Sequence, residues 1–207
     1  MNKIFQFGLG RTGSTLIYRI IKEIYPTVIK CHLPEIKPNL DSNCKIVVSI
    51  RHPIESFLSY IRVIEFPNSN NNISFSNDLL SKYLRQRINE EKQLKDILNN
   101  YSSKILVLKY EKFYNNFDYI LNHLEEFLGI HTDDTEREKI INKCSIENSI
   151  KIQNSMSSFH SYDKDSHIHG RHISTPTPKE SYKFINDEQL QFLESNLKDA
   201  ISFWSKY

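Results

Sequence analysis

The chain has 207 residues, of which 39% are hydrophobic and 25% charged, a composition typical of globular rather than disordered proteins. Its formal net charge of +2 is too small to indicate a nucleic-acid or anionic-membrane partner, so any positive potential must be local to a site. Three cysteines without CxxC spacing favour reduced thiols over a disulfide scaffold. With no apolar run of membrane-spanning length and a first strand expected from residue 3, we expect neither a membrane span nor a secretory signal. We therefore expect a cytoplasmic protein in which residues 1–207 form one domain.

The chain opens on a strand, a glycine loop and a helix. An apolar run over residues 3–8 leads into GLGRTGST over residues 8–15, after which apolar residues recur at helical spacing. Successive N–H groups of such a loop, backed by a helix N-terminus, form a nest for a phosphate. The spacing of Gly8 and Gly13 matches the Walker A pattern, but Ser14 stands where that pattern requires Lys. The loop therefore predicts a phosphate site that is poorly equipped for a triphosphate.

Strands and helices alternate over most of the remaining chain. Further strands are expected at residues 27–31, 45–50 and 104–108, and helices at 53–64, 78–99, 117–128, 133–143, 146–152 and 186–204. This alternation predicts an α/β fold with a central parallel sheet and helices on both faces. Residues 154–181, rich in Ser, His and Pro, read as a long loop, and loops of that length are usually functional or mobile.

The residues that suggest chemistry all come directly after a strand. They are the glycine loop at 8–15, Lys30, His32, Arg51 and Tyr110. Ligands of open parallel sheets bind beyond the carboxyl ends of the strands. Topology alone therefore predicts that these residues converge on one site.

Several segments, in order, resemble the P-loop sulfotransferases, which use 3′-phosphoadenosine 5′-phosphosulfate (PAPS). GRTGST over residues 10–15 resembles the family's 5′-phosphosulfate loop, and IKCHLP over 29–34 resembles its Lys-Thr-His-Leu-Pro segment. KIVVSIRHPIESFLS over 45–59 is similar to the 3′-phosphate motif, a strand followed by Arg and then Ser. Looser matches are LVLKYE over 106–111 and FLG over 127–129. The resemblance implies a P-loop-type three-layer fold.

The resemblance implies a role for each residue of the glycine loop and of the next strand end. The loop residues Arg11, Thr12, Gly13, Ser14 and Thr15 would hold the 5′-phosphosulfate, with Arg11 also reaching the bridging oxygen. Lys30 would stabilise the sulfuryl oxygens, and His32 would be the general base. Alternation along the strand puts Lys30 and His32 on the same face. The alternative for Lys30 is a charge at the end of a strand, exposed to water. The alternative for His32 is a structural role.

The remaining expected contacts concern the 3′-phosphate and the base of the nucleotide. Arg51 and Ser59 would hold the 3′-phosphate, although a buried, capped hydroxyl is the other interpretation of Ser59. Tyr110 either contacts the adenine or ribose or is a core tyrosine. Arg171, with His172, would close over the 3′-phosphate.

A metal is not implied. A site built from His167, His169 and His172 is the less favoured hypothesis, because no Cys or carboxylate spacing supports it.

The sequence also departs from the family. Leu16 replaces an aromatic that often stacks on adenine, and only a short segment joins Thr15 to His32, so much of the usual acceptor-binding structure is missing. The acceptor is a hydroxyl-bearing small molecule, glycan or other compound that the sequence does not identify. Two other functions stay open: a P-loop small-molecule or nucleotide kinase, and a non-catalytic module that binds adenosine 3′,5′-bisphosphate.

Overall fold

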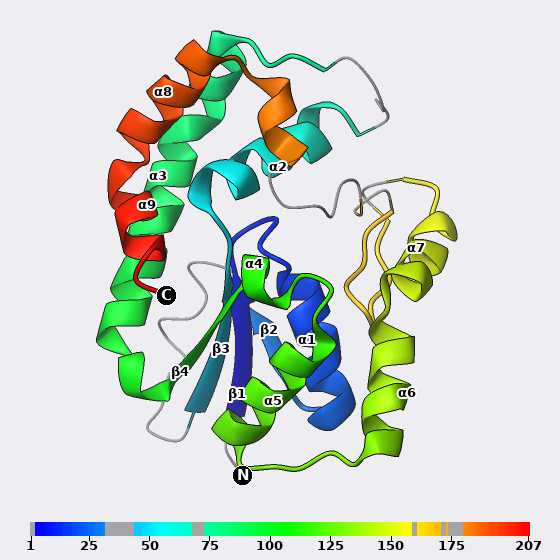
Figure 1. The fold of residues 1–207 in the computed structure, drawn as a ribbon. Coiled ribbons are helices and arrows are strands. Elements are labelled where there is room, and N and C mark those ends of the chain that lie inside the picture. Colours follow the sequence, from blue (N-terminus) through cyan, green and yellow to red (C-terminus); the bar gives the residue numbers. More distant parts are fainter. Residues whose placement is uncertain (1–2, 32–43, 68–72, 159–160, 171–172, 174–179) are drawn as a thin grey trace.

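A computed structural model describes residues 3–31, 44–67, 73–158, 161–170, 173 and 180–207 of the chain (Figure 1). Four strands form one sheet: β1 (Lys3–Gly8), β2 (Ile29–Cys31), β3 (Cys44–Ile50) and β4 (Ile105–Lys109). Their order in the sheet is β2-β1-β3-β4, and every pair is parallel. The predicted α/β fold with a central parallel sheet, of the three-layer P-loop type, is confirmed.

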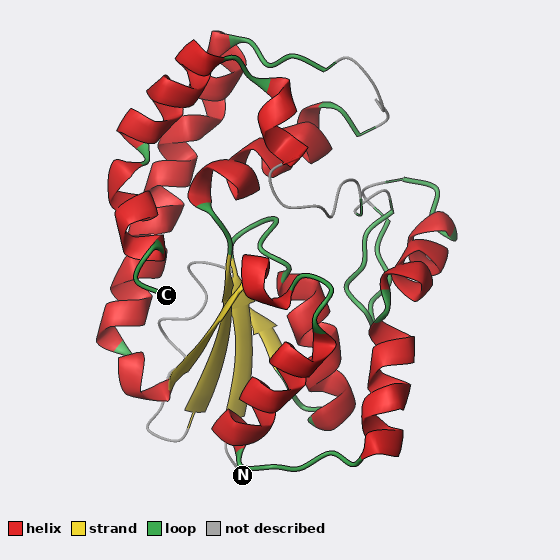
Figure 2. Cartoon of the chain, viewed as in Figure 1, coloured by secondary structure: helices red, strands yellow, loops and turns green. Residues whose placement is uncertain are grey.

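Helices cover the sheet and extend beyond its carboxyl edge (Figure 2). Their bounds are α1 (Ser14–Ile24), α2 (Pro53–Glu65), α3 (Asn77–Asn100), α4 (Tyr110–Phe113), α5 (Phe117–Leu128), α6 (Asp134–Cys144), α7 (Ile146–Asn154), α8 (Asp187–Asn196) and α9 (Lys198–Trp204), with short 3-10 turns η2 (Ser102–Lys104) and η3 (Glu180–Phe184).

The sheet buries both of its faces because the side chains of its strands alternate between two apolar layers. On one face, Ile4 and Val47 join a cluster with α1, α5 and α6. On the other, Phe7 and Val48 pack against α3, with Phe203 and Trp204 of α9 at the margin of the cluster. Residues 3–109 therefore supply the sheet, while α9, at the far end of the sequence, helps to cover it.

A third apolar cluster lies beyond the carboxyl edge of the sheet. Helix α2 contributes Phe57 and Leu58, which pack with residues from α3, η3 and α8, including Phe184 and Leu193. The hydrogen bond from Phe75 N to Phe184 O, 2.9 Å, ties the start of α3 to η3. This cluster fixes the direction in which α2 leaves the sheet, and α2 carries several of the predicted site residues.

The strand order places β1 at the centre of a topological change. The chain passes from β1 through α1 to β2 on one side, and β3 then pairs with β1 on the other side. At such a point the connections leave in opposite directions and open a crevice at the carboxyl edge. The glycine loop follows β1 and Arg51 follows β3, so both enter this crevice.

One predicted helix differs from the structure, and one observed helix was not predicted. The single helix expected over residues 186–204 is in fact α8 and α9, separated at Leu197, whose side chain is 1% exposed. Because of this break, the Leu197 side chain packs into the third cluster, whereas α9 packs against the sheet. The short helix α4, directly after β4, was not predicted, because a single turn leaves no periodic pattern in the sequence.

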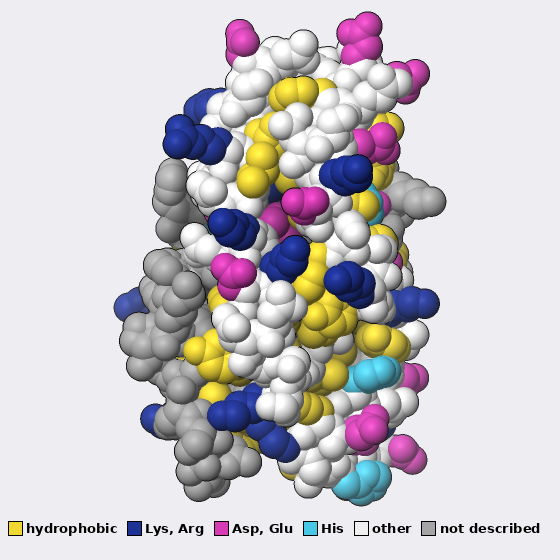
Figure 3. Space-filling model, turned by 90° about the vertical axis from the view of Figure 1, so that its left-hand side faces the viewer, with side chains coloured by type: hydrophobic (Ala, Val, Ile, Leu, Met, Phe, Trp, Pro, Cys, Tyr) yellow, Lys and Arg dark blue, Asp and Glu magenta, His cyan; other side chains and the backbone are white. Residues whose placement is uncertain are grey.

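The surface carries charges of both signs. On the face drawn in Figure 3, dark-blue and magenta side chains are interspersed, with hydrophobic side chains exposed between them. This agrees with the 27 Lys and Arg against 25 Asp and Glu in the sequence. Among the described residues, no helix combines the length and the apolar character that crossing a membrane requires.

Candidate active site

The glycine loop is held in a shape that only glycine permits at two positions. A Cβ on Gly8 would lie 2.4 Å from Ser49 Oγ and 2.7 Å from Thr12 Oγ1, too close for any real contact. Gly13, the N-cap of α1, has a φ of 78°, and a Cβ there would lie 2.7 Å from Phe113 Cζ. Gly8 therefore lets β3 approach the loop, and Gly13 lets α4 approach it. The result is a tight cradle at the N-terminus of α1.

The hydroxyl of Thr12 points into the protein. Its Oγ1 donates to Leu9 O at 2.8 Å and lies 3.1 Å from Ser49 Oγ, and the residue is 1% exposed. Thr12 therefore braces the loop against β3. Only its backbone N–H is left to serve an anion.

Arg11 reaches from the glycine loop to α2. It has a φ of 69°, in the left-handed region that is uncommon for residues other than glycine. Its Nε donates to Ser59 Oγ at 3.1 Å, which joins the expected 5′ and 3′ phosphate-binding segments. Burial, followed by the charge of Arg51, lowers the pKa of Arg11 to about 10. Two guanidinium groups are thus held near each other before any anion is bound.

Lys30 joins β2 to the same loop. Its Nζ donates to Thr15 Oγ1 at 2.8 Å and lies 5.6 Å from the centroid of the Tyr18 ring. Burial lowers the pKa of Lys30 to about 8, so its ammonium loses a proton just above neutral pH. The sequence predicted that Lys30 and the glycine loop would share a site, and the structure places them in contact.

Arg51 is fixed at the end of β3 from three sides. Its side chain is 3% exposed, and Nη2 lies 3.1 Å from Glu55 Oε2. The guanidinium carbon lies 4.3 Å from the centroid of the Tyr110 ring, and Nη1 donates to Arg11 O at 3.5 Å. Tyr110 thereby packs against a cation of the site, and burial raises the pKa of its hydroxyl to about 12. Its hydroxyl is therefore protonated at neutral pH.

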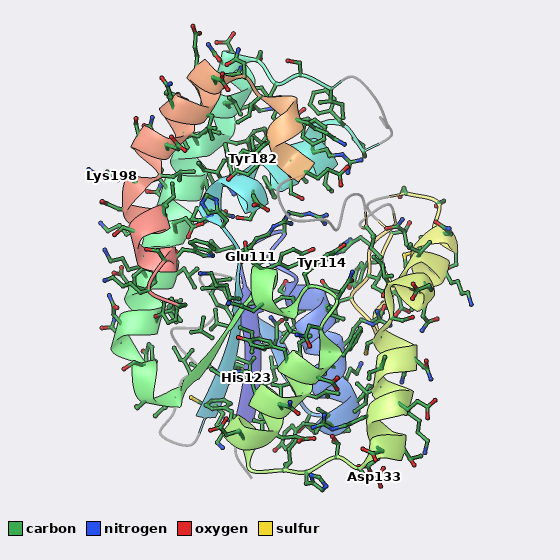
Figure 4. The ribbon with its side chains drawn as sticks, viewed as in Figure 1. Glu111, Tyr114, His123, Asp133, Tyr182 and Lys198 are labelled. Atoms are coloured by element: carbon green, nitrogen blue, oxygen red, sulfur yellow. The ribbon has the colours of Figure 1, made fainter. Side chains whose placement is uncertain are left out.

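Three further residues, none of them predicted from the sequence, support the end of β3 where Arg51 lies. The backbone N–H of His52 donates to Glu111 Oε1 at 2.9 Å, and Tyr182 OH lies 3.2 Å from His52 Nδ1. Figure 4 labels Glu111 on α4 and Tyr182 on η3, near the point where α2 leaves the sheet. The Tyr-Glu pair that follows β4 in the sequence could have indicated a role for Glu111. Nothing in the sequence pointed to Tyr182, which lies 130 residues from His52.

A small cavity lies behind Arg51, between the sheet and α9. It measures about 10 Å³ and is lined by Arg51, Arg87 and Trp204, among others. Within the described part of the chain, Arg51 Nε, Arg87 Nε and Trp204 Nε1 are buried without a hydrogen-bond partner. The Trp204 ring also packs edge-on against the His52 ring, 4.9 Å between centroids. Helix α9 is therefore part of the support of Arg51.

Three predicted site residues, His32, Arg171 and His172, lie outside the described residues. The segment before Arg171 is described and docks on α1: the His167 ring packs edge-on against Tyr18, and Lys22 pairs with Asp165 at 2.5 Å. His169 packs against the ring of Tyr162. Within the described ranges, no group of three His, Cys, Asp or Glu side chains lies close enough to hold a metal ion.

The cradle generates a first prediction, for Gly8→Ala. The added methyl collides with Ser49 and Thr12, so the loop must move away from β3, and binding of adenosine 3′,5′-bisphosphate should weaken by at least about tenfold. Calorimetric titration measures the dissociation constant. Gly129→Ala is the control, because Gly129 ends α5 outside the loop and has open space around its Cβ position. Its positive φ of 71° should cost about 1 kcal/mol of stability without a change in affinity, and equal affinities in the two variants would contradict the cradle.

No curated protein sequence matches the chain. The mouse sulfotransferase SULT7A1 complexed with PAP superposes with a TM-score of 0.69 at 15% identity, over 97% of this chain and 84% of that one. Retinol dehydratase in complex with androsterone and inactive cofactor PAP gives a TM-score of 0.58, also at 15% identity, over 84% of this chain and 52% of that one. These similarities show the fold.

The family model described as the sulfotransferase domain matches residues 17–201, from the first turn of α1 to α9. The match covers most of the sequence, including the Lys30, Arg51, Ser59 and Tyr110 positions. The chain therefore belongs to the sulfotransferase family.

Proposed function

We propose that this sulfotransferase takes the sulfuryl group from PAPS and transfers it to a hydroxyl of an acceptor, with His32 as general base. The observation that carries the proposal is the contact between Arg11 and Ser59, 3.1 Å, which joins the glycine loop to the α2 segment that resembles the family's 3′-phosphate motif. PAPS has both a 5′-phosphosulfate and a 3′-phosphate, so a site for it needs both segments side by side. Support comes from the family match and from the PAP in both similar solved structures.

The described residues fit such a donor. The backbone N–H groups at residues 12–15, at the N-terminus of α1, suit the 5′-phosphosulfate, and the clash that a Cβ on Gly8 or Gly13 would cause shows how closely that cradle is packed. Arg51 and Ser59 suit the 3′-phosphate. Arg51 is 4% exposed, and its Nε is buried without a partner among the described residues, which leaves one hydrogen-bond donor of this guanidinium unsatisfied.

The bound donor supplies an activated sulfuryl group, and the protein supplies positioning and charge. Arg11 and Lys30 place two cations beside the loop, where charge develops on the leaving phosphate and on the sulfuryl oxygens. Lys30 is anchored on Thr15 and Arg11 on Ser59, so both are held in place before the donor arrives. Preorganised charges of this kind contribute more than charges that must be recruited during the reaction.

The acceptor must lose its hydroxyl proton, and His32 is our candidate for receiving it. A neutral imidazole with an ordinary pKa near 6.5 accepts a proton on a ring nitrogen at neutral pH. His32 follows β2 directly, one residue beyond its last residue Cys31, and two residues after Lys30. The roles of Arg171 and His172 at the 3′-phosphate, and of Tyr110 near the adenine or ribose, belong to the same proposal.

We also propose that residues 1–207 act as a single domain. Helix α9 packs on the same sheet face as α3, and α8 packs on α2, so the C-terminal helices complete clusters begun near the N-terminus. The kinase alternative is weaker because Ser14, in α1, takes the place of the Walker lysine. The non-catalytic alternative predicts nucleotide binding without transfer.

Calorimetric titration with adenosine 3′,5′-bisphosphate, adenosine 5′-monophosphate and ATP tests the donor. We expect the bisphosphate to bind at least about tenfold more tightly than the monophosphate, because a charge-assisted contact to the 3′-phosphate contributes about 1.5–3 kcal/mol. Tight ATP binding without bisphosphate binding would favour the kinase. Bisphosphate binding without transfer of labelled sulfate to any of a broad set of alcohols and phenols would favour the non-catalytic module.

His32→Ala tests the base. Turnover should fall by about 10²–10⁴, the usual contribution of general base catalysis, while affinity for adenosine 3′,5′-bisphosphate stays within twofold. The pair of measurements separates a lost base from a lost binding site. Full turnover in the variant would remove His32 from the mechanism while leaving the family and the donor unaffected.

Lys30 predicts a pH dependence. Its pKa is lowered to about 8, so the ammonium is present below that pH and is lost as pH rises through it. The kcat/KM for the donor should therefore fall above pH 8, with the slope expected when a single group loses its proton. Lys30→Arg, whose guanidinium stays charged, should be flat through the same range. An unchanged fall in Lys30→Arg would assign the titration to another group.

A further inference from the structure

Three buried N–H groups without an acceptor belong to residues that line one small cavity, the cavity behind Arg51. They are Nε of Arg51, Nε of Arg87 and Nε1 of Trp204, none of which has a hydrogen-bond partner in the part of the chain that the structure describes. The three residues come from separate places in the sequence: the end of β3, α3 and α9. Arg51 and Arg87 are each 4% exposed, so bulk solvent does not reach their guanidinium groups freely.

Leaving these donors unpaired would destabilise the fold. A buried N–H group without an acceptor costs about 1–3 kcal/mol, and more when it belongs to a charged side chain. Each of the two guanidinium groups is otherwise held by a carboxylate: Arg51 Nη2 lies 3.1 Å from Glu55 Oε2, and Arg87 Nη2 lies 2.7 Å from Glu91 Oε1. What the three Nε–H and Nε1–H groups need is therefore a further acceptor in the cavity that their residues share.

The size and the lining of the cavity favour a water molecule as that acceptor. The cavity measures about 10 Å³, and a space of about 10–15 Å³ is the smallest that holds one water molecule. Glu91 lines the cavity together with the three donors, so a ligand there must accept from N–H groups and also tolerate a carboxylate. Water does both, because it can donate a hydrogen bond to Glu91. A halide ion is larger, only accepts, and is repelled by the carboxylate.

We propose that this cavity is a binding site for one ordered water molecule. Its oxygen accepts hydrogen bonds from Arg51 Nε, Arg87 Nε and Trp204 Nε1, and one of its hydrogens is donated to the Glu91 carboxylate. The oxygen has two lone pairs for three donors, so two of the donors share one lone pair. Four contacts lie at the upper end of the range for a buried water molecule. The inference does not depend on the identity of the sulfuryl donor, because every contact in it is made within the protein.

The water molecule makes α3 and α9 part of the system that fixes Arg51. Arg51 Nη2 is held by Glu55, and Nη1 donates to Arg11 O at 3.5 Å. With the water oxygen at Nε, each nitrogen of this guanidinium has a partner. The orientation of Arg51 is then set before any ligand binds, by contacts that reach as far along the chain as Trp204.

A crystal structure of the unmodified protein, at a resolution that shows ordered water, tests the site directly. We expect one water oxygen in the cavity, about 2.7–3.2 Å from Trp204 Nε1 and from at least one of the two guanidinium Nε atoms. A second crystal, soaked in sodium bromide, should show no anomalous scattering there. A bromide peak in the cavity would overturn the proposal in favour of a halide site, and a cavity without electron density would overturn it outright.

Nuclear magnetic resonance tests the site in solution, because Trp204 is the only tryptophan in the sequence and gives a single indole N–H signal. We expect a nuclear Overhauser contact between that proton and water, with the sign of a long-lived complex. Trp204→Phe identifies the signal by removing it. Absence of the contact in the unmodified protein would contradict a resident water molecule.

Thr12→Val is the matched control for this measurement. Among the described residues that line the cavity, Thr12 alone carries a hydroxyl, whose proton could relay the signal by exchange with solvent. The contact between the Trp204 indole and water should persist in Thr12→Val. Its loss in that variant would assign the contact to the Thr12 hydroxyl and would count against the water molecule.

Discussion

The site depends on one constraint of topology, the position of β1 between β2 and β3. Because the chain turns one way after β1 and the other way after β3, their carboxyl ends face a common crevice. The glycine loop, Lys30 and Arg51 then meet without any long connection. The hydrogen bond between Arg11 and Ser59 is possible only because α2 leaves β3 over the same crevice. Packing of α2 against η3 and α8 holds it there.

Much of the fold could be predicted from the sequence because its strands are short, apolar and flanked by polar turns. The β1 and β3 strands lie where the apolar runs placed them, and the helix expected from residue 186 begins there, at a capping box formed by Asn186 and Gln189. The break at Leu197 was missed because an apolar periodicity continues through it, and only the geometry of the third cluster decides the turn. Local patterns specify elements well, but they do not specify where one packed surface ends and another begins.

The sequence indicated that residues following strands would lie together at one edge of the sheet, but it did not indicate the residues that support them from a distance. Lys30, Arg51 and Tyr110 sit at strand ends, where topology alone gives them meaning. Thr12 was expected to offer its backbone N–H to the donor; that its hydroxyl braces the loop against Ser49 is a contact that no spacing rule contains. Tyr182 belongs to η3, and the position of η3 relative to the crevice is set by tertiary packing. The sequence shows that Tyr182 is a tyrosine, but not that it contacts His52.

Helix α9 has a consequence for how the protein is made. Trp204 contacts His52 and lines the cavity behind Arg51, and Lys109, at the end of β4, lies 3.4 Å from its ring centroid. A ribosome has synthesised both β1 and β3 long before it reaches residue 204. Until α9 emerges, that part of the sheet face and the support of Arg51 stay open to water. Completion of the support of Arg51 is therefore a late event in folding, because it requires a contact between residues that lie far apart in the sequence.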